Sequence, residues 1–435
     1  MNITSLHILV ITTRSPLRLV AGLPLLVRNV LAATSIGAPK VTILSDLATT
    51  ELTPALQQIQ AHNPELSLNL STLSQWVNHG MKTIGDDKIL LLHTDGAINP
   101  AWIKTLLQDS PDQNEALTYH CGSSDHDHVL LSATQLSRTL TTLGESGPIT
   151  VDTLYKQLIP NTCQRTTDKF DHAAYYGSIV DAEDVVEVEK QLFRRLAKKS
   201  DGYVSRYLNR PLSTHLSRLL LPFNISPTQL TWVTALSGIA MFLAFISGQT
   251  YSVILGCILF QVASIVDGMD GEIARIKFMA SSRGAAWDTG VDMATNLLFI
   301  VGLMYALSLQ YGPSYLQLGI YLLIISGTAI GLLSLLVYFG PGGGSFDIVG
   351  QALVTRLAAF PRAQKIMAII EKCFKRDAYA LCFALLGAIG LAYAIPWILA
   401  VGVSLWLLAV IINTPYILNA RSADILPEHI KDLRP

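Results

Sequence analysis

The chain lacks an excess of charge of either sign. Its 435 residues carry 31 Lys and Arg against 32 Asp and Glu, a formal net charge of −1. A partner as acidic as nucleic acid selects for a basic surface, so we do not expect nucleic acid as the main partner. The five cysteines follow neither a metal-binding spacing nor a paired framework, which is typical of free thiols in a reducing compartment. The first residues lack a basic stretch followed by a long apolar run, so we expect no cleaved signal peptide.

Charged residues are missing altogether from two long stretches, residues 219–266 and 293–346. Each stretch is longer than the roughly 20 residues that cross a bilayer as one helix. Turn-forming residues at 248–249 and 310–314 divide each stretch into two. We therefore expect four spans at 227–247, 251–275, 285–308 and 315–338, and two more at 378–394 and 396–417.

Lys and Arg are distributed unequally over the loops of these six spans. The loops after the first, third and fifth spans carry none, whereas the opposite side carries nearly all of them, including those of residues 346–377. The positive-inside rule then predicts a multi-pass protein of the inner (cytoplasmic) membrane. Both termini, the soluble part and the acidic residues described below would face the cytoplasm.

Residues 1–185 alternate short apolar runs with amphipathic segments. The expected strands are 6–12, 40–45, 66–71, 88–94, 116–121 and 128–133, and the expected helices are 24–37, 53–63, 72–81, 100–109 and 134–144. This alternation predicts an α/β domain with a mostly parallel, Rossmann-like sheet covered on both faces. Ligands of such sheets bind at the carboxyl ends of strands, so Asp95 is a candidate site residue; a loop aspartate without a role is an equal alternative.

The composition divides the chain into four parts. Residues 1–185 are the soluble α/β domain, 186–222 a linker with an amphipathic juxtamembrane helix, 223–420 an all-α, six-span transmembrane domain, and 421–435 a cytoplasmic tail. In the juxtamembrane helix Arg206, Arg210 and Arg218 alternate with Leu, Val and Tyr, as in a helix that lies on an anionic membrane surface.

Four aspartates interrupt the apolar part of the chain. Asp267 and Asp270 stand three apart and Asp288 and Asp292 four apart, so each pair lies on one helix face. The short segment between the pairs, which holds Gly284, predicts a helical hairpin that brings the four carboxylates together. Clustered acids are costly to desolvate unless a cation lies among them. Because oxygen-rich sites suit hard divalent ions, above all Mg²⁺, the sequence predicts a metal site.

The complete pattern is Asp267-x2-Asp270-Gly271-x2-Ala274-Arg275-x8-Gly284-x3-Asp288-x3-Asp292. It matches the signature of the CDP-alcohol phosphotransferases at every fixed position, and the chain resembles this family over about residues 200–418. The resemblance implies that a CDP-linked alcohol gives its phosphoryl-alcohol unit to a second hydroxyl, with release of CMP, in a homodimer. An ion-coupled transporter would also place acids inside a membrane, but it would not need this spacing.

The motif also suggests a role for each of its residues. Asp267, Asp270 and Asp288 are the expected ligands of two Mg²⁺ or Mn²⁺ ions that clamp the attacking and leaving oxygens. Asp292 is a further ligand and the expected acceptor of the hydroxyl's proton. Small side chains let a nucleotide lie against the helices, although close helix packing is their alternative role, and Arg275 can pair with a phosphate or a motif acid. The expected nucleotide-binding residues are Gly271, Ala274, Arg275, Gly284 and Thr231, the last in a segment (226–231) that resembles the family's first span.

The acceptor is less well defined by the sequence. A phosphorylated acceptor needs a basic pocket, and Arg210, Lys375 and Arg376 flank the membrane part on the expected cytoplasmic side. Each of these is equally a positive-inside anchor. The resemblance leaves the donor alcohol open, with CDP-diacylglycerol and CDP-inositol as examples, and places the function in phospholipid or inositol-phosphate synthesis.

Residues 1–185 resemble the sugar-phosphate nucleotidyltransferases in segments 17–44 and 90–107, and the second segment would give Asp95 a metal-binding role. That family needs a glycine-rich loop after the first strand, because backbone N–H groups must approach the triphosphate. Here the loop, residues 11–16, has no glycine, and Ser15 stands where a lysine is expected. We interpret the domain as a degenerate, inactive copy. Two alternatives stay open: it makes the CDP-alcohol from CTP, or it is a binding or assembly module.

Overall fold

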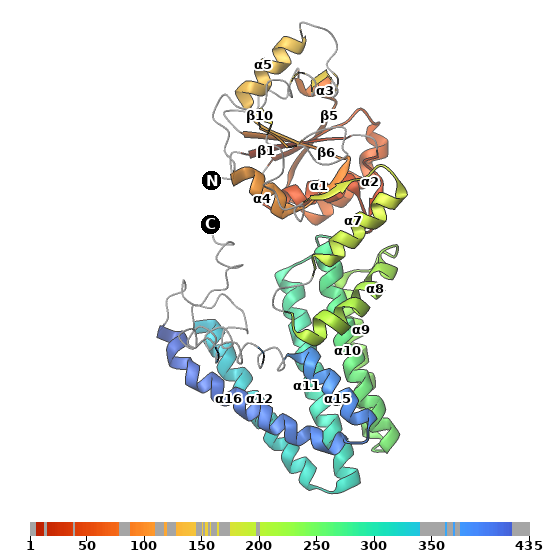
Figure 1. The fold of residues 1–435 in the computed structure, drawn as a ribbon, viewed down its shortest axis with the longest axis vertical. Coiled ribbons are helices and arrows are strands. Elements are labelled where there is room, and N and C mark those ends of the chain that lie inside the picture. Colours follow the sequence, from red (N-terminus) through yellow and green to blue (C-terminus); the bar gives the residue numbers. More distant parts are fainter. Residues whose placement is uncertain are drawn as a thin grey trace. The chain divides into compact units, whose positions relative to one another are not determined.

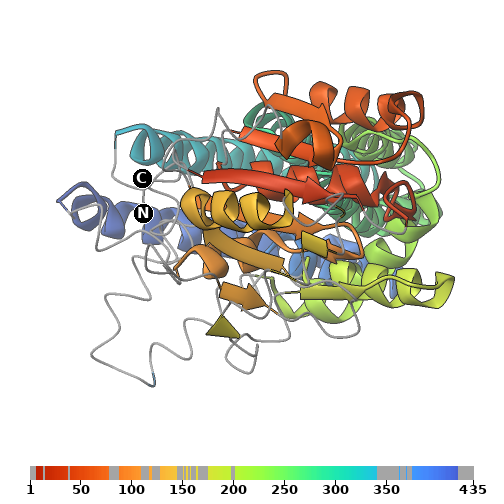
Figure 2. The ribbon, with the colours of Figure 1, turned by 90° about the horizontal axis from the view of Figure 1, so that it is seen from above.

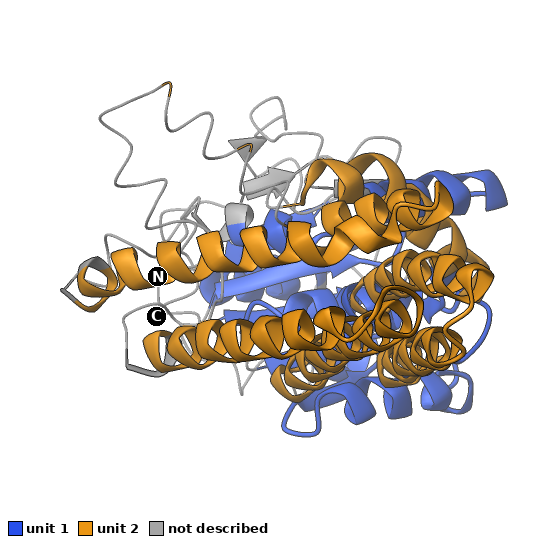
Figure 3. Cartoon of the chain, turned by 90° about the horizontal axis from the view of Figure 1, so that it is seen from below, with its two compact units in different colours: residues 1–196, 221–224, 274–279 blue, residues 197–220, 225–273, 280–435 orange. Residues whose placement is uncertain are grey.

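The computed structural model divides the chain into two compact units (Figure 3). Unit 1 comprises Met1–Leu196, Leu221–Asn224 and Ala274–Met279, and unit 2 comprises Ala197–Leu220, Ile225–Ile273 and Ala280–Pro435. Within them, the structure describes residues 6–12, 15–37, 40–77, 88–108, 117–119, 128–144, 150, 153–154, 157, 163–164, 175–196, 201–339, 362, 369 and 375–419. The expected tail and most of the basic segment 346–377 lie outside the described residues.

Unit 1 is built around a seven-stranded sheet of order β10-β8-β9-β6-β1-β4-β5 (Figure 2). Its strands are β1 Leu6–Ile11, β4 Lys40–Leu44, β5 Ser67–Ser71, β6 Lys88–His93, β8 Leu117–Tyr119, β9 His128–Ser132 and β10 Cys163–Gln164. Only β9 runs antiparallel to its neighbours in the sheet, so all six expected strands and the mostly parallel sheet are confirmed. The sequence missed β10 and two small ribbons, β2 Leu19–Val20 with β3 Leu23–Pro24 and β7 Gly96–Ile98 with β11 Tyr175–Ser178. Strands of two to four residues are too short to show a periodicity.

Helices cover both faces of this sheet, and β1 shows why. Ile8 and Val10 point into a cluster of buried side chains shared with α1, α2 and α4, whereas Leu9 and Ile11 point into a second cluster shared with α5. A strand buried on both faces reads as a continuous apolar run, as this one does. The helices of unit 1 are α1 Leu25–Thr34, α2 Thr49–His62, α3 Leu73–Gln75, α4 Pro100–Gln108, α5 Ala133–Gly144 and α7 Ala182–Arg194. All five helices expected before residue 145 are present, although α3 is a single turn and residues 78–81 lie outside the described part.

Two short loops of the apolar half of the sequence belong to unit 1. In the loop 274–279, Phe278 packs against the buried cluster of α1, and the Arg28 guanidinium lies 5.8 Å from its ring centroid. In the same loop Lys277 donates from Nζ to the carbonyl of Phe223 at 3.2 Å. Gly22 (φ +76°) closes the β2–β3 turn, and a Cβ there would lie 2.9 Å from the carbonyl oxygen of Leu221. Only glycine fits both that backbone angle and that approach.

The described residues of unit 2 form helices (Figure 1). They are η6 Ser205–Asn209, α8 Arg210–Leu220, α9 Pro227–Ile246, α10 Thr250–Ile276, α11 Ser282–Tyr311, α12 Ser314–Phe339, α15 Arg376–Ala388, η7 Ala392–Ala394 and α16 Ile395–Asn419. Local sequence sets the start of α9: Ser226 and Gln229 form a capping box around Pro227 at the first helical position. The turn before α10 is made by Gly248 (φ +65°).

Five helices among the described residues are long and apolar enough to cross a bilayer: Pro227–Ile246, Thr250–Ile276, Ser282–Tyr311, Ser314–Leu336 and Ala392–Pro415. They correspond to five of the six expected spans. The remaining segment, expected at 378–394, forms α15, which has 13 residues. Thirteen residues rise only about 20 Å, short of the roughly 30 Å hydrocarbon layer. The helix ends early because the chain turns at Gly390 (φ +80°), within a run that is apolar throughout.

Aromatic rings from four helices form the centre of unit 2. Phe260 of α10 stacks on Phe299 of α11 with ring centroids 4.2 Å apart, and Phe299 stacks in turn on Phe383 of α15 at 5.5 Å. Phe245 of α9 meets Phe299 edge-on at 5.6 Å. Each of these phenylalanines is at most 2% exposed. The packing therefore ties α15 to α9, α10 and α11 in spite of its shortness.

The sheet of unit 1 contains a buried histidine whose charge we expect to control acid stability. His128 stacks on His93 with centroids 4.0 Å apart and meets the edge of Trp102 at 4.8 Å. Burial, and secondarily the neighbouring His93, hold the pKa of His128 well below its usual value of about 6.5. As the pH falls below that value the unfolded chain takes up a proton that the folded chain refuses, so the free energy of unfolding must decrease.

We therefore expect unit 1 to lose stability between pH 7.5 and 5.5, by up to about 1.4 kcal/mol per pH unit below 6.5. His128→Phe, which keeps a ring, should reduce this loss, whereas His62→Phe at the end of α2 should retain it. Pulse proteolysis of the full-length protein in denaturant at both pH values measures the difference. An identical loss in wild type and His128→Phe would contradict the prediction.

Candidate active site: an acidic cluster at the α10–α11 hairpin

The expected helical hairpin brings acids from α10 and α11 together. Carboxylate oxygens of Asp267, Asp288 and Asp292 all lie within 4.8 Å of one another. The start of α11 is fixed locally, because Ser281 caps the helix by accepting a hydrogen bond from the backbone N–H of Gly284 at 3.0 Å. From that start, the next turns of α11 carry Asp288 and Asp292 to the face that meets Asp267.

Asp270, the fourth motif acid, is held differently. It is 5% exposed and accepts a hydrogen bond from the hydroxyl of Thr231 at 2.6 Å and another from the backbone N–H of Gly271 at 2.5 Å. These two donors occupy both oxygens of the carboxylate. Thr231, expected to touch the nucleotide, therefore touches a motif acid in this structure, and the hydroxyl orients that acid.

A guanidinium lies against two acids of the cluster. Arg376, the first residue of α15, contacts a carboxylate oxygen of Asp292, and its Nη1 atom lies 3.4 Å from Oδ1 of Asp267. The carboxylates lie in a part of the chain that is otherwise apolar, where like charges are stable only when a cation compensates them. The acceptor candidate Arg376 is thus a direct neighbour of the acidic cluster.

The residues of this cluster fit a divalent metal ion. All three groups are carboxylates, the oxygen donors that Mg²⁺ and Mn²⁺ take in proteins. Ligand oxygens about 2.1 Å from an ion are at most about 4.2 Å apart, so the observed spread needs to close by only a few tenths of an ångström. In addition, Oδ1 of Asp288 is buried and has no hydrogen-bond partner among the described residues. Buried polar atoms normally have a partner, so this oxygen is suited to bind a metal ion.

A cavity of about 230 Å³ opens beside the cluster. Asp267 and Asp292 line it, together with all three acceptor candidates, Arg210, Lys375 and Arg376. The remaining lining comes from the segment 201–213, from α10 and from the start of α15, and consists of Asp201, Gly202, Ser205, Asn209, Ser213, Ser264, Gly268 and Asp377. The structure thus brings together basic residues that lie 165 positions apart in the sequence, next to the motif acids.

The other expected nucleotide residues follow the same hairpin. Gly271 continues the stripe of Asp267 along α10, Ala274 and Arg275 lie in its last turns, and Gly284 is exposed in the first turn of α11. No large side chain therefore rises from positions 271, 274 or 284.

Asp95 lies in unit 1, directly after β6. It is 5% exposed, with Oδ2 3.6 Å from Nδ1 of His93. Asn29 of α1 fixes the turn around Asp95, donating to the carbonyls of His93 and Gly96 and accepting from the N–H of Ile98. The expected position at the carboxyl end of a strand is therefore confirmed.

The sequence analysis missed several polar residues near the cavity. Gln261 donates to the side chain of Asn209 at 2.8 Å, and Asn209 donates to the hydroxyl of Ser264 at 3.2 Å. Asp377 accepts a hydrogen bond from the backbone N–H of Ser205. An isolated glutamine within an apolar stretch of α10 was the available signal, because such residues seek a partner in the bundle.

Comparison with known proteins agrees with the geometry of the site. Residues 224–410 match the CDP-alcohol phosphatidyltransferase family. Among curated relatives, the "Bifunctional IPC transferase and DIPP synthase" of Thermococcus kodakarensis is 38% identical over 125 residues, 28% of each chain. Its namesake in Aquifex aeolicus is 36% identical over 145 residues, 33% of this chain and 32% of the relative. The matched part thus spans about a third or less of these relatives' length.

Solved structures were also compared. The 4-diphosphocytidyl-2C-methyl-D-erythritol synthase of Anaerococcus prevotii aligns with 44% of this chain and 99% of its own, at 10% identity and a TM-score of 0.33. A putative glucose-1-phosphate thymidylyltransferase of Bacillus anthracis aligns with 37% of this chain and 86% of its own, at 7% identity and a TM-score of 0.28.

The candidate membrane spans, the acidic hairpin and the family match all lie in the C-terminal part of the chain. The match of residues 224–410 to the CDP-alcohol phosphatidyltransferase family agrees with the resemblance that the spacing of the motif indicated.

The contact between Thr231 and Asp270 generates a prediction about metal affinity. Thr231→Val removes the hydroxyl that orients Asp270, and loss of such a supporting hydrogen bond weakens metal binding on the order of 10- to 100-fold. Thr231→Ser should retain most of the affinity. Thr234→Val is the matched control, because the Thr234 hydroxyl donates to the carbonyl of Leu230 in its own helix. Titration of the full-length protein with Mn²⁺ measures the affinities, and equal values for Thr231→Val and Thr234→Val would contradict the role given to Thr231.

Proposed function

We propose that the protein is an integral membrane CDP-alcohol phosphotransferase. It moves the phosphoryl-alcohol unit of a CDP-alcohol to the hydroxyl of an acceptor and releases CMP. The observation that carries this proposal is the clustering of Asp267, Asp288 and Asp292 beside a basic cavity, within the segment that matches the family. The transfer forms one bond between the acceptor oxygen and the phosphorus of the alcohol-bearing phosphate. It breaks the bond from that phosphorus to the oxygen of CMP, which leaves with the electron pair.

The motif acids would hold two Mg²⁺ or Mn²⁺ ions, with Asp267, Asp270 and Asp288 as ligands and Asp292 as a further one. When bound, such ions neutralise the pyrophosphate charge that otherwise repels the acceptor oxygen. Asp292, one turn along α11 from Asp288, is also the residue we propose to take the proton of the acceptor hydroxyl; its place in the cluster and in the cavity wall supports this role.

The donor nucleotide would lie along the hairpin on the side of the small residues. Gly271, Ala274 and Gly284 let the nucleotide approach the helix backbones, and Arg275 supplies a charge for a phosphate. Thr231 contributes through Asp270, whose carboxylate it holds.

The cavity favours a phosphorylated, polyol-like acceptor. Lys375 and Arg376, at the start of α15, line the cavity, and Arg210, the first residue of α8, lines it as well. Guanidinium and ammonium groups bind phosphate oxygens strongly, and hydroxyl-rich substrates suit a wall of serine, asparagine and aspartate. The relatives are named as IPC transferases and DIPP synthases, which supports an inositol-phosphate type of substrate and leaves CDP-diacylglycerol or CDP-inositol as donor.

We also propose the following arrangement in the membrane. α15 acts as a sixth, shortened span, because its rings belong to the aromatic centre of unit 2. Both termini, residues 1–185 and the acidic cluster face the cytoplasm across the inner membrane, with 186–222 as linker and juxtamembrane helix and 223–420 as the membrane domain. The protein works as a homodimer.

A second candidate function concerns unit 1. The relatives carry two activities in their name, which favours a bifunctional enzyme over an inactive N-terminal domain. In this alternative unit 1 makes the CDP-alcohol from CTP, with Asp95 at the carboxyl end of β6 as metal ligand. The glycine-free loop at residues 11–16 argues for the opposing view, a binding or assembly module.

Transfer is tested by CMP release from full-length protein in detergent with Mg²⁺ or Mn²⁺. CDP-diacylglycerol and CDP-inositol serve as donors, each with inositol, inositol phosphate, glycerol phosphate and serine. We expect release with one donor and acceptor pair, and a loss on the order of 10²- to 10⁴-fold in Asp292→Asn. Asp46→Asn, the same change at an exposed position of unit 1, should leave the rate unchanged. Release that is equal in Asp292→Asn and Asp46→Asn would remove Asp292 from the mechanism.

The second function is tested in the Asp292→Asn protein, in which transfer is blocked. A bifunctional enzyme should still release pyrophosphate from CTP and an alcohol phosphate such as inositol phosphate. Asp95→Asn should abolish that release, because the metal ligand of unit 1 is lost. No pyrophosphate from wild type or Asp292→Asn would rule out the bifunctional reading and leave unit 1 as a binding module.

A further inference from the structure

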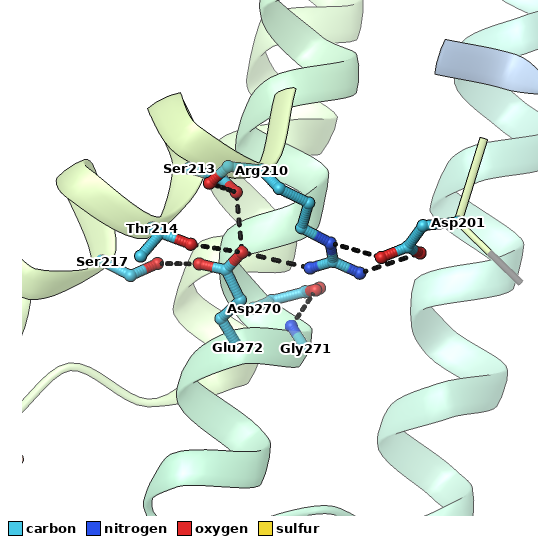
Figure 4. Close-up of polar contacts among 8 residues, drawn as sticks. All are labelled: Asp201, Arg210, Ser213, Thr214, Ser217, Asp270, Gly271 and Glu272. Atoms are coloured by element: carbon cyan, nitrogen blue, oxygen red, sulfur yellow. Dashed lines mark hydrogen bonds and ion pairs between the residues drawn. The ribbon is translucent and has the colours of Figure 1, made fainter. Parts of the chain in front are cut away.

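One buried glutamate of α10 is used by neither the motif nor the cluster described above. Glu272 is fully buried, two residues after Asp270. Its Oε1 atom accepts hydrogen bonds from Nη1 of Arg210 at 3.1 Å and from the hydroxyl of Ser213 at 2.7 Å (Figure 4). The hydroxyl of Thr214 lies 3.4 Å from the same oxygen, and the hydroxyl of Ser217 donates to Oε2 at 2.8 Å.

All four donors come from one face of α8. Positions 210, 213, 214 and 217 follow the i, i+3, i+4, i+7 spacing of a helix stripe, and all of them converge on one carboxylate (Figure 4). The exposed side of α8 is mostly apolar instead: Leu212, Leu216 and Leu219 are between 40% and 57% exposed, and His215 lies among them. The helix is amphipathic as expected, but its polar face is turned inward, and Arg210 faces Glu272 and not a membrane surface.

Glu272 does not belong to the metal cluster. Five positions along a helix turn the side chain by about 140°, so Glu272 and Asp267 point to different sides of α10. Gly268 is one turn from Glu272 on the side that meets α8, and a Cβ at Gly268 would lie 3.4 Å from the Ser213 hydroxyl. The small residue and the acid together define the surface on which α8 lies.

This contact fixes one wall of the cavity. Arg210 is held from both sides, by Glu272 and by Asp201, whose Oδ2 accepts from Nε of Arg210 at 3.2 Å (Figure 4). Arg210, Ser213 and Asp201 all line the cavity, whereas Glu272 is behind them. Two carboxylates bind the guanidinium of Arg210, and such charge-assisted contacts fix the orientation of an arginine side chain. Arg210 is therefore oriented before any substrate binds.

We propose that Glu272 is a positioning residue for acceptor binding. It anchors α8 to α10 and fixes the position of the Arg210 guanidinium in the cavity wall. The acceptor is thereby held at a fixed position relative to the acids on the other side of α10. This proposal rests on the proposed function and deepens it. The proposal assigns the two substrates to different faces of α10. Glu272 supports binding of the acceptor through α8, whereas binding of the donor and the metal depends on the other faces of α10 and on α11.

The test compares Glu272→Gln, Glu272→Asp and Glu187→Gln in full-length protein. Glu272→Gln keeps the shape but removes the charge, Glu272→Asp keeps the charge, and Glu187→Gln makes the same chemical change at an exposed position of α7. Amide hydrogen exchange of residues 205–220 measures how firmly α8 is held in place, and this measurement does not require enzymatic activity. Mn²⁺ affinity and the KM values for CDP-inositol and inositol phosphate report the site.

In Glu272→Gln we expect faster exchange across α8 and an acceptor KM raised on the order of 10- to 100-fold. The donor KM and the Mn²⁺ affinity should stay within about twofold of wild type, and Glu272→Asp should recover part of the acceptor KM. Glu187→Gln should behave as wild type in every readout.

Two results would overturn the proposal. One is unchanged exchange of α8 in Glu272→Gln. The other is a fall in Mn²⁺ affinity as large as the rise in acceptor KM, since Glu272 would then support the whole of α10. If wild type releases no CMP with these substrates, the proposed function is contradicted for them, and the exchange of α8 together with the Mn²⁺ affinity still decides whether Glu272 anchors α8 independently of the metal site.

Discussion

A carboxylate removed from water next to other carboxylates is stable only if cations or hydrogen-bond donors compensate it. The end of α10 carries Asp267, Asp270 and Glu272 within six residues, and each has a different kind of compensation. Arg376 of α15 contacts Asp267, and the hydroxyl of Thr231 in α9 donates a hydrogen bond to Asp270. Side chains of α8 donate hydrogen bonds to Glu272. The helices α15, α9 and α8 thus each contribute a compensating polar group to the end of α10. The arrangement of unit 2 follows from this requirement as much as from its aromatic centre.

The same requirement explains how a short helix can open a substrate cavity. α15 places Lys375, Arg376 and Asp377 at its start, where Arg376 meets the cluster and Asp377 binds the backbone of η6. η6 is a π-helical turn, a conformation that is common at functional sites because it redirects side chains. It turns Asn209 inward to meet Gln261 and Ser264. Polar contacts therefore hold η6 and the start of α15, both of which line the cavity.

Periodicity and spacing gave most of the architecture from the sequence. The apolar runs of unit 1 are confirmed as strands, and the spacing of Asp267, Asp288 and Asp292 is confirmed as one cluster, because local helix geometry determines which residues share a face. The early end of α15 could not be seen, since residues 389–394 are as apolar as those before them and the turn depends on the backbone of Gly390. The partners of Arg210 were also hidden, because Glu272 stands at a position that the motif leaves open.

The different faces of α10 have a consequence for how this chain tolerates changes of length. One inserted or deleted residue between Asp267 and Glu272 would rotate everything beyond it by about 100°. The glutamate would leave the hydroxyls of α8, and after a deletion the apolar Ile273 would take its place against them. Insertions before Asp267 would instead shift the whole acidic segment along the aromatic centre. The loop between α10 and α11 is equally constrained in length, because the motif fixes eight residues between Arg275 and Gly284 and because Ser281 in that loop caps α11.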